Sequence, residues 1–94
     1  MVIGLKRSKE KDTQFKFKAP QAKKVSVGGS FNNWNPNAFL AKKDSKGNWS
    51  VTVGLTPGTY EYKFYVDGAW MTDPACKKTV NNPFGSVNSV VEVK

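Results

Sequence analysis

The sequence predicts an all-β fold, a single antiparallel sandwich of about seven short strands. Apolar residues recur at every second position through most of the chain, and no segment has them at helical spacing. Turn-forming groups of Gly, Pro, Asn and Asp separate these segments at intervals of about 8–12 residues. In a chain of 94 residues, this pattern is typical of immunoglobulin-like sandwiches, although the Cys…Trp…Cys pattern of antibody domains is absent.

The first part of the chain divides into a charged start and a strand. Residues 1–12 are mostly charged and are expected to form a flexible basic tail. One domain is then expected over residues 13–94, because the chain is short and contains no linker or internal repeat. Its first strand, residues 13–19, alternates lysines with Phe15 and Phe17, which we expect to face the core.

Three further strands and one loop follow in order. Residues 23–30 carry valines at alternate positions and run into Gly28-Gly29, which predicts the second strand. The sequence FNNWNPN at residues 31–37 predicts a tight loop, because Asn and Pro favour turns and left-handed backbone conformations. A short third strand is expected at residues 39–40. The fourth, residues 49–53, carries Trp49, which we expect in the core.

A hairpin in TYEYKFYVDGAWMTDP, residues 59–74, is the clearest element. Aromatic and polar residues alternate in its first half, as they do in a half-buried strand. Asp67-Gly68 predicts a two-residue type I′ turn, since both central positions of that turn need positive φ. This turn fixes the register and sets Phe64 opposite Met71 on the apolar side.

The same register gathers three side chains on the polar face of the hairpin. Tyr65 is expected to face Trp70, with Lys63 diagonal to that indole. A tryptophan on a solvated face has no core to fill, so this group is a candidate binding surface. The alternative is that a second structural element covers the face.

The C-terminal part is expected to contain one loop and one strand. Residues 74–84 include Asn, Pro and charged residues without alternation, which predicts a long irregular loop. Residues 86–93 carry valines in phase and predict the last strand.

Composition argues against an enzyme or a metal protein. The chain has no histidine, which removes the usual general base and the commonest metal ligand. Its seven carboxylates are dispersed, Cys76 has no histidine to activate it, and no glycine-rich phosphate loop occurs. We therefore expect no catalytic residues, no metal site and no cofactor. A cytoplasmic location is expected from the single cysteine and from the absence of a membrane span or a secretory signal pattern.

The net charge of +8 raises nucleic acid as a partner. All but one of the 15 basic residues are lysines, however, and most are scattered along the chain. Scattered lysines keep strand faces and edges soluble. Arginine stacks and forks onto phosphates better than lysine, so its scarcity disfavours nucleic acid.

Aromatic and amide side chains concentrate in three places. Trp34 lies among asparagines, Trp70 lies beside Tyr65 and Lys63, and the third group surrounds the start of the last strand. Composition leaves Trp34 open as a plug of the sandwich end or as an exposed platform. Flat aromatic faces beside hydrogen-bond donors suit a sugar, whose C–H face stacks on indole, and also suit single-stranded nucleic acid.

Three stretches resemble one family: VSVGGSFNNWNP, GNWSVTVGLTPGTYEYKFYVDGAWMTDP and NPFGSVNSVVEV. Together they are similar to the glycogen-binding domain of the AMP-activated protein kinase β subunit. More broadly they resemble carbohydrate-binding module family 48, which also occurs at the N-terminus of isoamylases and branching enzymes. The resemblance covers residues 25–93. It implies an early-set immunoglobulin-like sandwich that binds α-1,4-linked glucan without catalysis, with a kinase or glucan-processing enzyme as the expected protein partner.

The resemblance also implies a set of carbohydrate-binding residues, in which two tryptophans stack on sugar and the others add apolar and hydrogen-bonding contacts. These are Trp34, Lys63, Trp70, Phe84, Ser86 and Asn88. Phe84 stands where the kinase domain has a leucine, and Ser86 stands where it has a threonine. Secondary contacts are expected from Asn33 and Tyr65. The alternative function is a protein-interaction module whose sugar site is secondary.

Overall fold

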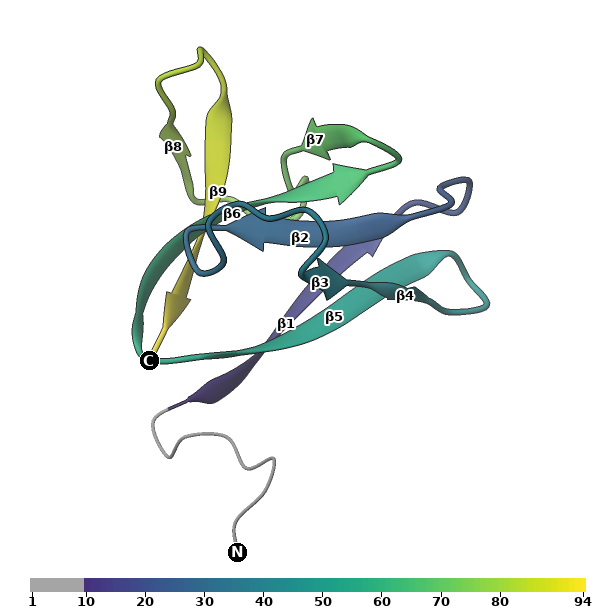
Figure 1. Cartoon of the computed structure of the whole chain (residues 1–94), viewed down its shortest axis with the longest axis horizontal. Coiled ribbons are helices and arrows are strands. Elements are labelled where there is room, and N and C mark those ends of the chain that lie inside the picture. Colours follow the sequence, from purple (N-terminus) through teal and green to yellow (C-terminus); the bar gives the residue numbers. More distant parts are fainter. Residues whose placement is uncertain (1–9) are drawn as a thin grey trace, which may run out of the picture.

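The computed structural model describes residues 10–94, which form two antiparallel β-sheets (Figure 1). These residues contain no helix that could cross a membrane. Residues 1–9, which make up most of the expected basic tail, lie outside the described residues. The strands are β1 (Lys11–Lys18), β2 (Val25–Gly29), β3 (Phe39–Leu40), β4 (Lys42–Lys43), β5 (Asn48–Leu55), β6 (Gly58–Val66), β7 (Ala69–Met71), β8 (Thr79–Asn81) and β9 (Val87–Val93).

The strand order confirms the predicted immunoglobulin-like, early-set sandwich. The smaller sheet has the order β1-β5-β4, and the larger has the order β3-β2-β6-β9-β8, with β7 also paired to β6. Two strands were not predicted from the sequence, β4 and β8, and both are short. Because β8 falls inside residues 74–84, the expectation of an irregular loop there is wrong for residues 79–81. β1 also begins two residues earlier than the expected first strand.

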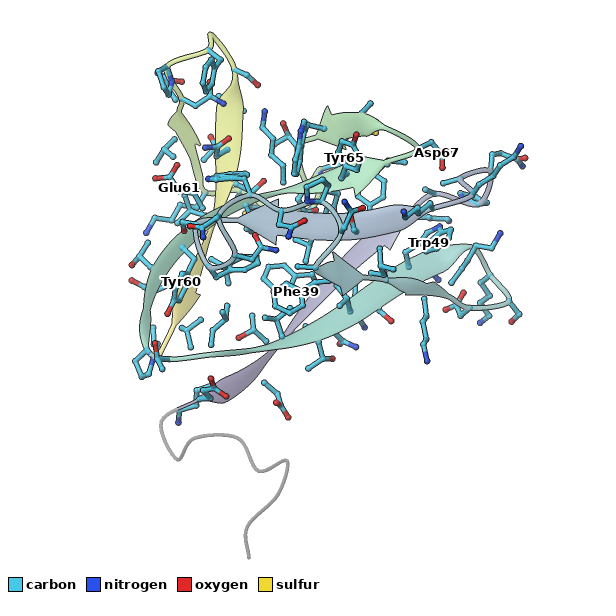
Figure 2. The ribbon with its side chains drawn as sticks, in the orientation of Figure 1. Phe39, Trp49, Tyr60, Glu61, Tyr65 and Asp67 are labelled. Carbon is cyan, nitrogen blue, oxygen red and sulfur yellow. The ribbon has the colours of Figure 1, made fainter. Side chains whose placement is uncertain are left out.

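Aromatic side chains from both sheets meet in the core. Phe15 and Phe17 on β1 each place their ring centroid 4.8 Å from a ring on β6, those of Tyr62 and Phe64 respectively. Trp49 is only 7% exposed, as expected, and its Nε1 donates a hydrogen bond to the Ala19 carbonyl at 2.9 Å. Figure 2 shows Trp49 with other side chains in the layer between the sheets.

The β6–β7 hairpin has the predicted register. Tyr65 pairs with Trp70, and Phe64 pairs with Met71. The turn residue Asp67 has a φ of 47°, and the glycine after it has a φ of 90°, which is the left-handed backbone that a type I′ turn needs.

Met71 corrects one expectation, because 44% of this residue is exposed although it lies on the apolar side of the hairpin. Register decides which face a side chain takes, whereas burial also requires a second sheet over that face. In Figure 1, β7 lies to one side of β1, β4 and β5 and is not covered by the smaller sheet. The expected apolar side is therefore buried at Phe64 and exposed at Met71.

The larger sheet divides in the middle of β6. At Tyr62, β6 pairs with β2 on one side, at Gly29, and with β9 on the other, at Ser89. From Phe64 onward β7 takes the side that β9 had occupied, so the two neighbours diverge around Lys63. The β8–β9 hairpin rises away from β7 in Figure 1 and leaves the sheet open between them.

Candidate functional site

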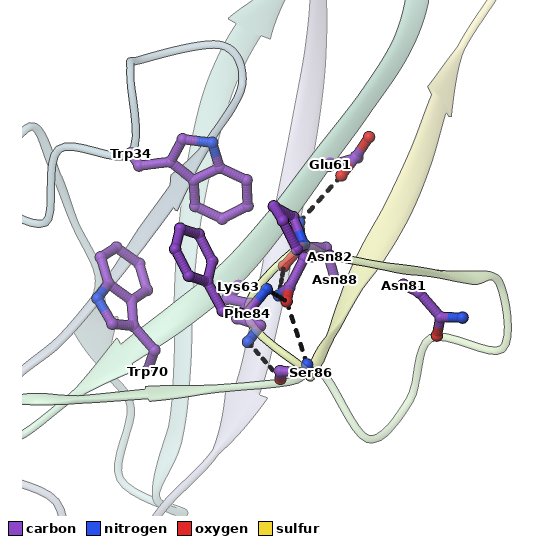
Figure 3. Close-up of a pocket in the computed structure, with 10 residues that line it drawn as sticks. Trp34, Glu61, Lys63, Trp70, Asn81, Asn82, Phe84, Ser86 and Asn88 are labelled. Carbon is purple, nitrogen blue, oxygen red and sulfur yellow. Dashed lines mark hydrogen bonds between the residues drawn. The ribbon is translucent and has the colours of Figure 1, made fainter.

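An open cavity of about 850 Å³ lies at this division, on the face of the larger sheet that points away from the core. Figure 3 shows the side chains around it. Its walls come from the 31–37 loop, β6, β7 and the β8–β9 hairpin. The lining residues are Trp34, Glu61, Lys63, Trp70, Asn81, Asn82, Pro83, Phe84, Ser86 and Asn88. The structure thus brings all six principal site residues expected from the sequence around one cavity.

Two indole rings form one wall of the cavity. The ring centroids of Trp34 and Trp70 are 6.0 Å apart, and the ring planes are inclined at 77°. Trp70 is 40% exposed, so its face is not covered by another element, and Trp34 is half-buried. Of the two placements left open for Trp34, the structure favours a platform that lines a surface cavity over a plug of the sandwich end.

A network around Asn32 holds the Trp34 loop. The Asn32 side chain accepts a hydrogen bond from the Gly29 amide at 2.9 Å, and it donates at 3.3 Å to the carbonyls of Val27 and Asn35. The Trp34 amide donates to the Gly29 carbonyl at 2.9 Å. These bonds offset the strain of Trp34, whose φ of 58° is uncommon for an aromatic residue.

Trp70 is fixed from two sides. The Tyr65 ring lies against it, with the centroids 4.8 Å apart. Gly28 on β2 lies beneath it, and a Cβ atom there would be 2.7 Å from Cη2 and 2.9 Å from Cζ3 of the indole. Only glycine leaves room for the indole at this depth, since carbon atoms normally approach to about 3.5–4.0 Å.

The opposite wall of the cavity is polar. Lys63 Nζ donates a hydrogen bond to Ser86 Oγ at 2.8 Å. Asn88 is 7% exposed, and both ends of its amide are engaged: Nδ2 donates to Glu61 Oε1 at 2.9 Å, and Oδ1 accepts from Asn82 Nδ2 at 3.1 Å.

Phe84 stands at the tip of the β8–β9 loop and is 89% exposed. Below it, Asn82 Oδ1 accepts hydrogen bonds from the amides of Phe84 and Ser86, at 2.9 Å and 3.1 Å. Gly85 supplies the positive φ, 79°, that this tight loop requires. The loop therefore presents a large apolar ring to solvent at the rim of the cavity, where it is available to a ligand.

The expected secondary contacts lie outside the lining of the cavity. Tyr65 lies against the Trp70 ring and supports it, and Asn33 is exposed in the loop with a φ of 55°. Glu61 and Asn82 were not predicted as site residues from the sequence. Strand alternation could have found Glu61, which is two residues from Lys63 on the same face. Asn82 begins the segment NPFG, which is itself a turn signal.

The chemistry of the cavity suits binding more than reaction. Among its lining residues, Glu61 is the single carboxylate, and the residues 10–94 contain no cluster of side chains that could hold a metal ion. Beneath the sheet, burial raises the pKa of Tyr62 well above its usual value, and a hydrogen bond of 2.7 Å from its hydroxyl to Asp73 adds to the shift. This buried pair faces the core side of β6 and is separate from the cavity.

Fold and cavity together define a class: a small β-sandwich module with an aromatic-lined surface cavity. A family model described as the glycogen recognition site of AMP-activated protein kinase matches residues 11–94, and the chain belongs to this family. This finding confirms the resemblance noted in the sequence.

The relatives are subunits of a larger enzyme. Over 72 residues the chain is 39% identical to 5′-AMP-activated protein kinase subunit beta-1 of Rattus norvegicus and 38% identical to subunit beta-2 of Homo sapiens. The aligned region is 77% of this chain and about a quarter of each relative, 25% in both cases. The chain therefore spans about a quarter of the length of the curated relatives it matches.

Proposed function

We propose that this domain binds α-1,4-linked glucan, in the form of glycogen, starch or malto-oligosaccharides, and does so without catalysis. The family assignment supports glycogen as the ligand. The observation that carries the finer proposal is the pair of indoles, 6.0 Å apart and inclined at 77°, in an open cavity. Two planes at this angle fit the curvature of an α-glucan, whereas a flat cellulose chain would meet only one of them.

Each wall has a role in this proposal. Trp34 and Trp70 stack on the apolar C–H faces of the sugar rings. Lys63 and Ser86 offer hydrogen-bond donors and acceptors to the hydroxyls, and Phe84 contacts the chain at the rim. Because the site is shallow and open, the affinity is expected to be weak, with a Kd of about 1 µM to 1 mM.

The test removes each indole in turn. Trp34→Ala and Trp70→Ala should each abolish retardation of the protein in native gels that contain glycogen, while the fold remains intact. Leu40→Ala is the matched control, because Leu40 is also an exposed apolar residue but does not line the cavity. Unchanged retardation in both tryptophan variants would reject the proposal. Maltoheptaose should quench or shift tryptophan fluorescence, and cellohexaose should not.

We also propose that the domain works inside a kinase or glucan-processing assembly, since its relatives are named as kinase subunits four times its aligned length. A protein partner captured from lysate should then stay bound in the presence of excess maltoheptaose. If maltoheptaose released every captured protein, the capture would be explained by glucan bound to both proteins rather than by contact between them.

Nucleic acid is the alternative ligand, and it predicts that binding weakens steeply as the salt concentration rises. Binding to neutral glucan should be nearly insensitive to salt.

A further inference from the structure

One residue of the cavity has no role in the proposed stacking and was not expected from the sequence. Glu61 lines the cavity on the face of β6 that also carries Lys63, and Figure 3 shows it beside Asn88, away from both indoles. Its only side-chain hydrogen bond among the described residues is the one that Oε1 accepts from Asn88. The carboxylate therefore keeps acceptor capacity for a ligand, since an ionised carboxylate has about four lone-pair sites.

The position of Glu61 along β6 matters. The Trp70 indole reaches over Gly28, and Gly28 pairs with Lys63 on β6. At about 3.4 Å per residue, Glu61 lies about 7 Å beyond Lys63 along the strand. A sugar residue stacked on Trp70 would not contact this carboxylate, whereas a longer chain that follows the strand would pass over it.

The hydrogen bonds around Glu61 hold it in place for this contact. Asn88 donates to Oε1 at 2.9 Å, and Asn82 in turn donates to Asn88 at 3.1 Å. Asn82 is fixed by two amides of the β8–β9 loop. A carboxylate that is already oriented loses little rotamer freedom when a ligand binds.

We propose that Glu61 forms an extension subsite, in which its carboxylate accepts hydrogen bonds from the hydroxyls of a sugar residue beyond the two indoles. The domain then binds longer α-glucan chains in preference to short ones. This inference rests on the proposed function, because it concerns the same ligand. In it Asn88 serves mainly to position Glu61, since its own amide is engaged at both ends.

Glu61→Gln tests the subsite without stranding Asn88, because the glutamine carbonyl can still accept the same hydrogen bond. Maltotriose and maltoheptaose would be titrated into each variant and followed by backbone chemical shifts in NMR, which can measure weak binding. The variant should lose about 3- to 10-fold in affinity for maltoheptaose, as a charged hydrogen bond becomes a neutral one. Its affinity for maltotriose should stay within about 2-fold of the wild type, a range that corresponds to less than 0.5 kcal/mol.

Equal losses for both sugars would show that Glu61 acts only by holding the loop, and no loss for either would show that it does not contact the ligand. Either result overturns the subsite. A second comparison, between Asn88→Ala and the double variant Asn88→Ala with Glu61→Ala, should show the same length-dependent loss, because the Asn88 amide that Glu61 accepts from is absent from both proteins. Failure of the subsite is distinguishable from failure of the proposed function: in the latter case the wild type itself would not bind maltoheptaose.

Discussion

Gly28→Ala should displace the Trp70 indole and weaken glucan binding while the domain stays folded. The added Cβ would lie 2.7 Å and 2.9 Å from two indole carbons, and ordinary contacts begin at about 3.5 Å. The ring edge must therefore move outward by about 0.6–0.8 Å or more. Trp70 is 40% exposed and can swing toward solvent. The indole would then leave the plane that sets the 77° angle with Trp34.

The expected magnitudes follow from these contacts. Overpacking costs about 1–3 kcal/mol in a closed core, but here one side of the ring is open, so the cost in unfolding free energy should lie near the lower end. Alanine also restricts the unfolded chain and returns about 0.4–1 kcal/mol. Net stability should change by less than about 1 kcal/mol, and affinity for maltoheptaose should fall about 10-fold, or 1.4 kcal/mol.

The assay combines binding with a report on the indole pair. Two indoles 6.0 Å apart should give an exciton couplet in far-ultraviolet circular dichroism, and Gly28→Ala should alter this couplet before any ligand is added. Gly54→Ala is the matched control, since Gly54 is also a strand glycine but the nearest atom to its added Cβ is the carboxylate of Glu10, at 3.1 Å. A Gly28→Ala protein with wild-type couplet and affinity would refute the argument, as would lost binding with an unchanged couplet.

Two other variants test the parts around the cavity. Tyr62→Phe should make the unfolding free energy less dependent on pH in alkali. Because the pKa of Tyr62 is raised in the folded protein, the unfolded chain loses this proton first as the pH rises. In the wild type the unfolding free energy should therefore fall by up to about 1.4 kcal/mol per pH unit above about pH 10. Urea unfolding at several alkaline pH values would show the difference, and parallel curves for both proteins would contradict it. Asn82→Ala removes the acceptor for two loop amides. The variant should show faster amide hydrogen exchange at Phe84 and Ser86 and several-fold weaker binding of maltoheptaose. Its unfolding free energy should fall by about 1 kcal/mol. Unchanged exchange at both amides would show that Asn82 does not hold the loop.

Local chemistry explains which parts of the fold were predictable. The Asp67-Gly68 turn alone determines the β6–β7 register, so Tyr65 and Trp70 could be paired from sequence. The exposure of Met71 depends on how far the other sheet extends, which no local pattern reports. Strand β8 is three residues long, too short for alternation to be recognised.

The candidate site shows the same limit. Its aromatic and polar lining residues could be named from the resemblance, but the sequence pattern places Gly28 only at the end of a strand. Its need for glycine comes from Trp70, more than forty residues later in the chain, and becomes visible only when β2 and β7 lie on either side of β6. Asn88 likewise was expected to face a sugar, and its engagement by Glu61 and Asn82 depends on the fold of the β8–β9 hairpin.

The alternation of β6 explains why binding and stability should be separable in this domain. Tyr62 and Phe64 point into the core between the sheets, whereas Glu61 and Lys63 point into the cavity. No residue of the described core cluster lines the cavity. Substitutions in the cavity therefore remove little buried apolar surface, and most should change the unfolding free energy by about 1 kcal/mol or less. The cavity itself exists because β9 and β7 diverge around Lys63, so the opening is created by strand pairing rather than by a gap in the core.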